Sequence, residues 1–210
     1  MAGTVLPHAL DGIDLGPRVL ELGPGYGAST RPLAARARSL TVLEYDPLLA
    51  ARLRTELGSV RVVHGDATNM GFGAGSFSAV VCFTMLHHLP GATVQDRLFA
   101  EAARVLRPGG VFAGTDSRPS LRWRLIHLGD TCTPIDPGPL PGRLETAGFT
   151  RVAVDADERL VRFAAYAPRR GRRGRGDPVA PGAERPRGPR LGWPPWNTVR
   201  WEVRACRFPC

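Results

Sequence analysis

The stretch that decides the fold is Val19–Gly27, which reads VLELGPGYG. A short run typical of a β-strand ends in glycines at positions 23, 25 and 27, and the alanine- and arginine-rich run Ala28–Arg38 after it predicts a helix. Glycine permits a tight turn and lets ligand atoms approach the backbone, and the first N–H groups of a helix favour a polar ligand. Alone, this stretch leaves two interpretations open, a dinucleotide-type GxGxxA loop and a simple strand–helix turn.

Strand-like and helix-like segments alternate along the chain. The predicted strands are Arg18–Leu22, Leu40–Tyr45, Val60–His64, Phe77–Phe83, Val111–Thr115, Arg151–Val154 and Leu160–Tyr166, and further helices are predicted at Leu48–Leu57, Val94–Leu106 and Leu140–Ala147. Asp46 and Pro47 are suited to the N-cap and first position of a helix, whereas Pro108-Gly109-Gly110 is expected to break one. Strands separated by helices imply a parallel sheet covered on both faces. We therefore expect an α/β fold, a Rossmann-like doubly wound and mostly parallel seven-stranded sheet with an antiparallel closing strand.

The charge distribution separates residues 1–168 from residues 169–210. The first part carries 17 arginines against 16 acidic residues, the second carries 11 against three, and the chain has no lysine. Glycine and proline supply 13 of the last 42 residues, as in low-complexity segments. We expect one folded domain over 1–168 and a disordered basic tail over 169–210. An arginine-rich nucleic-acid contact and a frameshifted or fused reading frame are the alternatives for the tail.

Composition disfavours several other classes of protein. The four cysteines, Cys82, Cys132, Cys206 and Cys210, show no metal or redox spacing, so no metal site is expected. The first ten residues do not resemble a signal peptide, and the longest apolar run, Ala79–Leu86, is too short to span a bilayer. We expect a protein of the reducing cytoplasm that has no membrane partner.

Two carboxylates follow later predicted strands. Glu44 stands 17 residues past Gly27 and can accept hydrogen bonds from both hydroxyls of a ribose, although a solvated strand-end carboxylate is the alternative. Asp66, in Gly65-Asp66-Ala67, can accept a hydrogen bond from an adenine amino group while the Ala67 N–H donates to a ring nitrogen. A plain Asx turn is the alternative for this tripeptide.

Two more motifs complete the set, a strand that ends in Leu86-His87-His88-Leu89 and the sequence LRPGG at Leu106–Gly110. The five motifs together resemble the class I S-adenosylmethionine (SAM)-dependent methyltransferases, in particular the broad group with a type 11-like domain that acts on small molecules such as quinone and sterol precursors. They occur in the family's order and at its usual distances over about residues 18–116, and residues 139–167 match in outline. A nicotinamide dehydrogenase need not carry the Gly65-Asp66-Ala67 motif or the LRPGG motif at Leu106–Gly110.

The resemblance implies which residues bind the cofactor, S-adenosyl-L-methionine. The glycine loop, with Glu21, Gly23, Gly25 and Gly27, faces the methionine part of the cofactor, and Glu44 binds the ribose. Tyr45 lies beside the adenine, and Asp66 and Ala67 contact it. Thr84, just past the fourth strand, lies near the sulfonium and the acceptor.

The acceptor side is less sharply defined by the sequence. His87 and His88 are candidate catalytic bases because histidine titrates near neutral pH, although a base is needed only where the acceptor must lose a proton. The alternative is a structural pair, with His87 packed under the sheet and His88 at its rim. Trp123 and His127 are candidate substrate contacts, with a surface helix and loop as the alternative. The fourth strand lacks the Asn/Asp-Pro-Pro-aromatic motif of base-amino methylation.

We thus expect an enzyme, a SAM-dependent methyltransferase (EC 2.1.1.-) that transfers a methyl group by in-line displacement to a small-molecule acceptor. Nucleic acid is expected to contact it only through the basic tail. The alternative is a non-catalytic protein that binds SAM or S-adenosylhomocysteine (SAH) and whose arginine-rich tail docks to nucleic acid or a partner.

Overall fold

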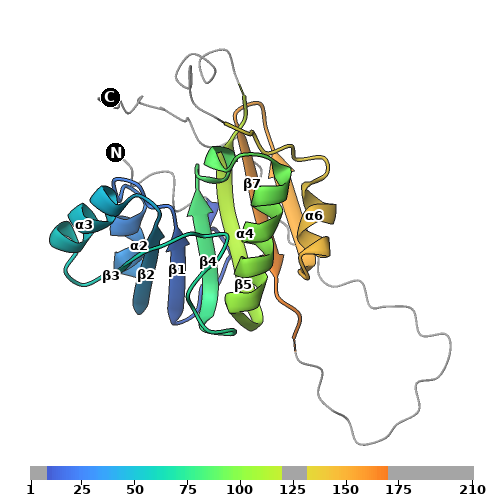
Figure 1. The fold of residues 1–210 in the computed structure, drawn as a ribbon. Coiled ribbons are helices and arrows are strands. Elements are labelled where there is room, and N and C mark those ends of the chain that lie inside the picture. The colour runs from blue at the N-terminus through green and yellow to red at the C-terminus, as the bar shows by residue number, and fades with distance from the viewer. Residues whose placement is uncertain (1–8, 120–131, 170–210) are drawn as a thin grey trace, which may run out of the picture.

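A computed structural model describes residues 9–119 and 132–169 of the chain (Figure 1). The strands are β1 (Arg18–Leu22), β2 (Ser39–Glu44), β3 (Arg61–His64), β4 (Phe77–Phe83), β5 (Leu106–Ser117), β6 (Thr150–Ala156) and β7 (Leu160–Tyr166). The helices are α2 (Thr30–Arg36), α3 (Pro47–Glu56), α4 (Ala92–Val105) and α6 (Leu140–Thr146), with a short 3-10 helix η2 (Leu86–His88).

The strands form one seven-stranded sheet in the order β3-β2-β1-β4-β5-β7-β6. Strands β1 to β5 pair in parallel, and β7 pairs antiparallel with both β5 and β6. This topology confirms the predicted doubly wound sheet and its antiparallel closing strand. We call the edge at which β1 to β6 end the carboxyl edge. The opposite edge, where β1 to β6 begin and β7 ends, is the amino edge.

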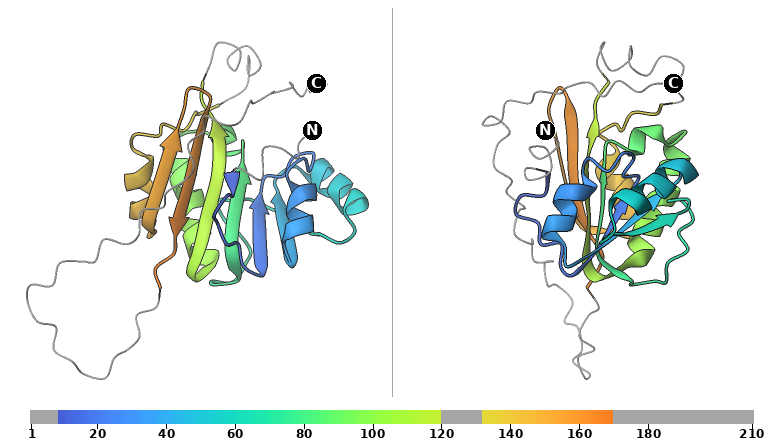
Figure 2. Two further views of the ribbon diagram at one scale, coloured as in Figure 1. Left: turned by 180° about the vertical axis from the view of Figure 1, so that it is seen from behind. Right: turned by 90° about the vertical axis from the view of Figure 1, so that its left-hand side faces the viewer.

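Helices lie on both faces of the sheet (Figure 2), and each face has its own apolar core. Phe99 from α4 and Leu144 from α6 pack with Phe112 and Phe163 on one face. Leu33 from α2 packs with Val81 and other strand residues on the other face, together with the N-terminal residues Ala9, Leu10 and Ile13. Because strand side chains alternate between faces, the near-continuous apolar runs of β4 and β5 supply both cores, as expected for a parallel sheet buried on both sides.

Most element boundaries differ from the prediction by at most two residues, and the lengths of α2 and β5 differ most. The predicted helix Ala28–Arg38 is shorter, since α2 begins at Thr30 after a turn made by the glycine loop. The strand predicted at Val111–Thr115 begins earlier, at Leu106, directly where α4 ends. Phe77 pairs with Leu106 and Ala79 with Val111, so the residues between form a bulge. Pro108 lacks a backbone N–H donor, so this motif interrupts the strand pairing rather than terminating the strand.

A buried cation fastens the N-terminal residues to the sheet. Arg162 of β7 is 3% exposed, and its guanidinium donates hydrogen bonds to the carbonyl oxygens of Ala9 and Asp11, each at 3.1 Å. Burial lowers the pKa of Arg162, and the nearby acids Asp11 and Asp155 oppose that effect. Buried charges are retained where they are paired or hydrogen-bonded, so Arg162 fixes the segment that covers this face.

Gly114 provides a test of the close approach between β4 and β5. A Cβ added there would lie 2.1 Å from the carbonyl oxygen of Cys82 and 3.1 Å from Cζ of Phe163. Because the first contact is backbone, Gly114→Ala should lower the free energy of unfolding by about 3 kcal/mol or more. The matched control is Gly142→Ala in α6, where a Cβ meets nothing within 4 Å and helix propensity predicts a gain of about 0.5–1 kcal/mol. Urea unfolding of both variants measures the difference, and equal midpoints would contradict the packing argument.

Candidate active site

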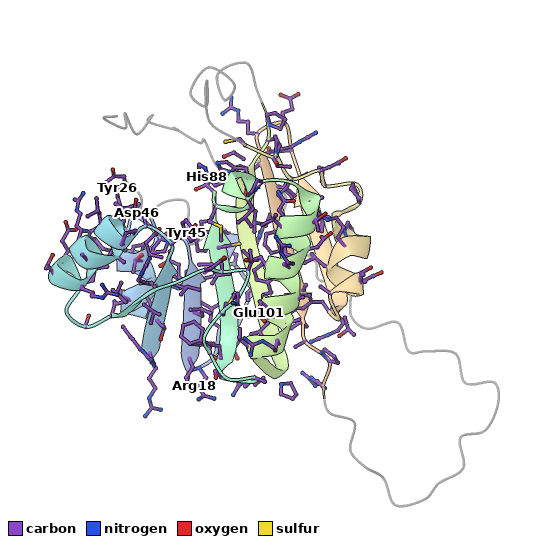
Figure 3. The ribbon with its side chains drawn as sticks, viewed as in Figure 1. Arg18, Tyr26, Tyr45, Asp46, His88 and Glu101 are labelled. Atoms are coloured by element: carbon purple, nitrogen blue, oxygen red, sulfur yellow. The ribbon has the colours of Figure 1, made fainter. Side chains whose placement is uncertain are left out.

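The residues singled out in the sequence gather at the carboxyl edge of the sheet. Figure 3 labels Tyr26, Tyr45, Asp46 and His88 along this edge and Arg18 at the opposite one. The strand order reverses between β1 and β4, because the chain leaves β1 for β2 and β3 and returns on the other side. In open parallel sheets, ligands bind in the crevice above the strand ends at such a switch point.

Glu44 at the end of β2 forms a hydrogen bond with the glycine loop. Gly23, Gly25 and Gly27 have φ angles of 59°, 56° and 76°, a left-handed conformation that glycine adopts without strain. The Gly25 N–H donates to Oε2 of Glu44 at 2.9 Å, and the Asp46 N–H donates to Oε1 at 3.0 Å. The buried carboxylate of Glu44 therefore joins the loop after β1 to the turn after β2, and each of its oxygens retains acceptor capacity.

Glu21 is a buried carboxylate with one unpartnered oxygen. Its side chain is 1% exposed, and the Ser29 hydroxyl donates to Oε1. Within the part of the chain that the structure describes, Oε2 of Glu21 and the Thr30 hydroxyl are buried without a hydrogen-bond partner. Burial raises the pKa of Glu21 to about 7, and the nearby charge of Glu44 adds to the effect, while the Ser29 and Thr30 hydroxyls oppose it. Glu21 is therefore a buried acid whose second oxygen faces only the Thr30 hydroxyl among the described residues, and a cation at this oxygen would favour its ionised form.

The adenine-side candidates lie on exposed turns after β2 and β3. Asp46 caps α3, since its Oδ1 accepts hydrogen bonds from the Leu48 and Leu49 N–H groups at 2.7 and 3.0 Å, as predicted. Tyr45 is 74% exposed. Oδ1 of Asp66 accepts from the Thr68 N–H at 2.7 Å and from its hydroxyl at 2.8 Å, so the Asx turn named as the alternative does form. A carboxylate engaged through one oxygen still has the other available.

Thr84 is held in an unusual backbone conformation at the end of β4. Its φ is 49°, although it is not glycine, and its N–H donates to the Thr115 carbonyl of β5 at 2.8 Å. Such conformations cost about 1–3 kcal/mol and gather at ligand sites. Next to it, Met85 packs onto the glycine loop, because a Cβ on Gly23 would lie 2.3 Å from Met85 Cγ. The absence of a side chain at Gly23 therefore makes room for Met85 at the β1–β4 junction.

His87 forms a buried pair with Asp116, a residue that the sequence reasoning missed. His87 Nδ1 lies 2.5 Å from Asp116 Oδ1, and the His87 backbone N–H donates to Oδ2 at 3.2 Å. The His87 ring is 3% exposed, and its carbonyl accepts from the Thr133 N–H at 2.7 Å. The sequence does contain a signal for this residue, because Asp116 directly follows the predicted apolar strand Val111–Thr115. This strand lies beside β4, the strand that precedes His87. Nδ1 faces the carboxylate, so Asp116 fixes the orientation of the imidazole ring.

The other candidates differ in environment. His88 is exposed, and its ring centroid lies 4.1 Å from that of His87. Trp123 and His127 lie outside the described residues. Cys82 is fully buried, and desolvation, with the charges of Asp116 and Glu21, raises the pKa of its thiol, which suits a core residue rather than a nucleophile. Within residues 9–119 and 132–169, no group of three or more His, Cys, Asp and Glu side chains is arranged to hold a metal ion.

The comparisons with known proteins agree with this geometry. The family model described as "Methyltransferase domain" matches residues 20–114. An uncharacterized methyltransferase of Synechocystis sp. is 30% identical over 149 residues, which cover 67% of this chain and 70% of that protein. The chain belongs to the class I SAM-dependent methyltransferases. A fatty-acid O-methyltransferase of Mycolicibacterium smegmatis is 38% identical over 108 residues, 50% of this chain.

The chain spans only part of the length of several relatives. The match covers between 25% and 39% of the length of the first three curated relatives. Among solved structures, a SAM-dependent methyltransferase of Thermotoga maritima superposes with a TM-score of 0.65 at 19% identity, over 79% of this chain and 88% of that one. That likeness concerns the fold. In the described portion of the methyltransferase, no helix is both long and apolar enough to cross a membrane.

The residues at the carboxyl edge fit the family's cofactor, SAM. SAM carries an ammonium and a sulfonium, two ribose hydroxyls and an adenine. The buried oxygen of Glu21 that has no partner suits a cation, and the carboxylate of Glu44 suits hydroxyl donors. A Cβ on Gly25 would meet nothing within 4 Å, so the loop backbone leaves open space beside these acids.

The raised pKa of Glu21 predicts a pH-dependent stability. Unfolded glutamate has a pKa near 4.3, so between about pH 4.5 and pH 7 the folded chain keeps a proton that the unfolded chain has lost. Stability must then fall as pH rises through this interval. The wild type should lose about 2–3 kcal/mol of unfolding free energy between pH 4.5 and pH 7. Glu21→Gln lacks the titrating carboxyl, so the variant should not show this loss. Urea unfolding across pH 4.5–8 measures this, and parallel profiles for the two proteins would refute it.

Proposed function

We propose that this methyltransferase transfers a methyl group from SAM to a small-molecule acceptor by in-line displacement. The observation that carries the proposal is the pair of buried acids, Glu21 and Glu44, on the two sides of the glycine loop. When bound, SAM supplies a methyl group already activated by the sulfonium. The protein must then position an acceptor, which can supply effective molarities on the order of 10⁵ M or more.

Each part of the cofactor has a matching group on the protein. Glu21 and the loop of Gly23, Gly25 and Gly27 hold the methionine end, with the Glu21 carboxylate facing the ammonium. Glu44 accepts the ribose hydroxyls through the acceptor capacity left by the Gly25 and Asp46 amides. For the adenine, the matching residues are Tyr45, Asp66 and Ala67. Thr84 borders the reacting centre.

The charge of the carboxyl edge favours a small acceptor over nucleic acid. Glu21, Glu44, Asp46, Asp66, Asp116 and Asp157 all lie at strand ends or in turns of this edge. Such a concentration of acids attracts a cationic cofactor and repels a polyanion. One relative is named a fatty-acid O-methyltransferase and another a ribosomal RNA small subunit methyltransferase, so the charge of this edge, rather than those names, supports a small acceptor. A small acceptor bound beside His87 fits this environment.

His87, oriented by Asp116, serves as the base for an acceptor that must lose a proton. The carboxylate holds the imidazole by its ring and by the backbone N–H of the same residue, so the ring cannot turn without breaking the pair. Asp116 also accepts from the Ser117 N–H at 2.7 Å. His87 is the better base candidate of the two histidines because Asp116 fixes its ring beside the end of β4, whereas His88 is exposed. Asp116 is a positioning residue.

The first prediction of this assignment concerns cofactor affinity. Glu44→Ala should weaken binding of SAH by about 1–3 kcal/mol, because the ribose hydroxyls lose a charged acceptor and the glycine loop loses its link to β2. Glu44→Gln retains an oxygen acceptor and should lose less. Calorimetric titration of SAH into each folded variant measures this. Unchanged affinity in Glu44→Ala would show that the ribose lies elsewhere.

The second prediction concerns the reaction. Transfer of labelled methyl groups from SAM should appear in the small-molecule fraction of a metabolite extract and be absent from the RNA and protein fractions. With the acceptor purified from that fraction, His87→Gln and Asp116→Asn should lower kcat by about 10²–10⁴-fold with KM and SAH affinity within threefold.

The matched control for the base is His88→Gln, which should keep kcat within threefold. Equal losses in the two histidine variants would remove the distinction drawn from Asp116, and full activity in His87→Gln would exclude it as the base. SAH binding without transfer to any fraction would favour the non-catalytic alternative.

A further inference from the structure

Charge is segregated between the two edges of the sheet. The carboxyl edge holds the acids described above and only two arginines, Arg118 and Arg159, among the described residues at its strand ends, whereas arginines stand at the amino edge of every strand except β4. They are Arg18 in β1, Arg38 before β2, Arg61 in β3, Arg107 in β5, Arg151 in β6 and Arg169 after β7, and all six are exposed. We call this set the arginine edge. Adjacent strands lie about 4.8 Å apart, so the row extends roughly 30 Å.

Near the middle of the row, the side chains of Arg107 and Arg169 lie against the backbone of Gly16 and Gly109. A Cβ on Gly16 would lie 3.1 Å from Nη2 of Arg107 and 2.9 Å from Cβ of Ser78. The Ser78 hydroxyl in turn accepts a hydrogen bond from the Arg18 N–H at 2.9 Å. Arg169 packs against the start of β5, since a Cβ on Gly109 would lie 3.3 Å from its Cγ. The sheet therefore brings together arginines that are far apart in sequence.

The arginine edge is not neutralised by neighbouring acids. Near the ends of α3 and α4, Glu56 pairs with Arg31 and Arg52, and Glu101 pairs with Arg104. Among the described residues, the six arginines of the edge form no salt bridge. Two other acids on this side, Asp14 and Glu145, are too few to cancel six positive charges.

The basic segment of the sequence begins at the same place. Residues 169–210 carry 11 arginines against three acidic residues, and their first member, Arg169, packs at the amino edge. The fold thus continues the arginine edge directly into the most positive part of the chain.

We propose that the arginine edge binds the phosphate backbone of a nucleic acid. Guanidinium groups match phosphate oxygens in charge and geometry, and a row of them suits a ligand with regularly repeated phosphates. Binding to a membrane surface would also need apolar groups beside the charges. The exposed large apolar side chains of the described residues are Tyr26, Tyr45 and Leu48, which lie at the carboxyl edge.

The location of this surface gives the nucleic acid a specific role. It lies across the sheet from the glycine loop, and the acids of the carboxyl edge repel phosphate. The nucleic acid is therefore an anchor rather than the methyl acceptor, and its binding does not compete with the cofactor. The inference is independent of which acceptor the enzyme methylates.

The test is fluorescence anisotropy of the full chain with a labelled 20-nucleotide RNA and a 20-base-pair DNA between 50 and 300 mM salt. Arg18→Gln/Arg107→Gln should weaken binding at 150 mM salt at least fivefold and reduce the salt slope by about 1–1.4 for the RNA, since each lost phosphate contact contributes about 0.7. The matched control, Arg97→Gln/Arg159→Gln, removes the same charge from exposed sites outside the arginine edge and should bind within twofold of wild type. Calorimetry with SAH verifies that both variants keep the cofactor site.

Four results would overturn the proposal. Wild-type affinity in the Arg18/Arg107 variant would show that the arginine edge does not bind the nucleic acid, and equal losses in both variants would indicate an effect of net charge alone. Competition between RNA and SAH would contradict the separation of the two sites. Binding to anionic phosphatidylserine vesicles in place of either nucleic acid would identify a membrane surface as the ligand. Loss of RNA binding with retained SAH affinity, confined to the first variant, supports it whether or not methyl transfer is detected.

Discussion

The reversal of strand order between β1 and β4 is the constraint on which the site depends. Connections from β1 run to one side and those from β4 to the other, so their loops diverge above the carboxyl edge and leave a crevice there. The acids of β1 and β2 lie on the α2 face of this crevice, and the His87–Asp116 pair lies on the α4 face. The residues proposed for the cofactor and for the acceptor thereby lie on opposite faces of one sheet, and Thr84 and Met85 lie at the junction between them.

The same arrangement explains why the site is costly to fold. Glu21 and Glu44 are both buried at neighbouring strand ends, and the charge of Glu44 adds to the burial that raises the pKa of Glu21. Backbone amides satisfy Glu44, whereas Glu21 keeps an oxygen with no partner. A cationic ligand with hydroxyl groups would supply positive charge to Glu21 and hydrogen-bond donors to Glu44. Instability in the free protein and affinity for the cofactor are therefore two consequences of the same burial.

Features that depend on residues close together in the sequence could be predicted, and features that depend on distant residues could not. Local patterns located β1 and β4 to the residue and the cap of α3 at Asp46, because glycine turns, apolar runs and an Asp-Pro pair act within a few residues. They misplaced the start of β5, since proline and glycine mark a break in hydrogen bonding without revealing whether the strand resumes. The link from Glu44 to Gly25 and the His87–Asp116 pair join residues 19 and 29 positions apart. The sequence identified Glu44 and His87 but not what each of them contacts.

The arginine edge needs to be separated from a simpler cause of charge segregation. Helices of this fold end at the amino edge, and cations near a helix C-terminus are favoured by its dipole. That effect accounts for Arg36, Arg54, Arg104 and Arg143, which stand in the last turns of α2, α3, α4 and α6. It does not account for Arg18, Arg61 or Arg107, which lie in strands, because strand dipoles in a sheet are small. The strand arginines are the part of the pattern that the fold does not require, and they are the part that an external anion would explain.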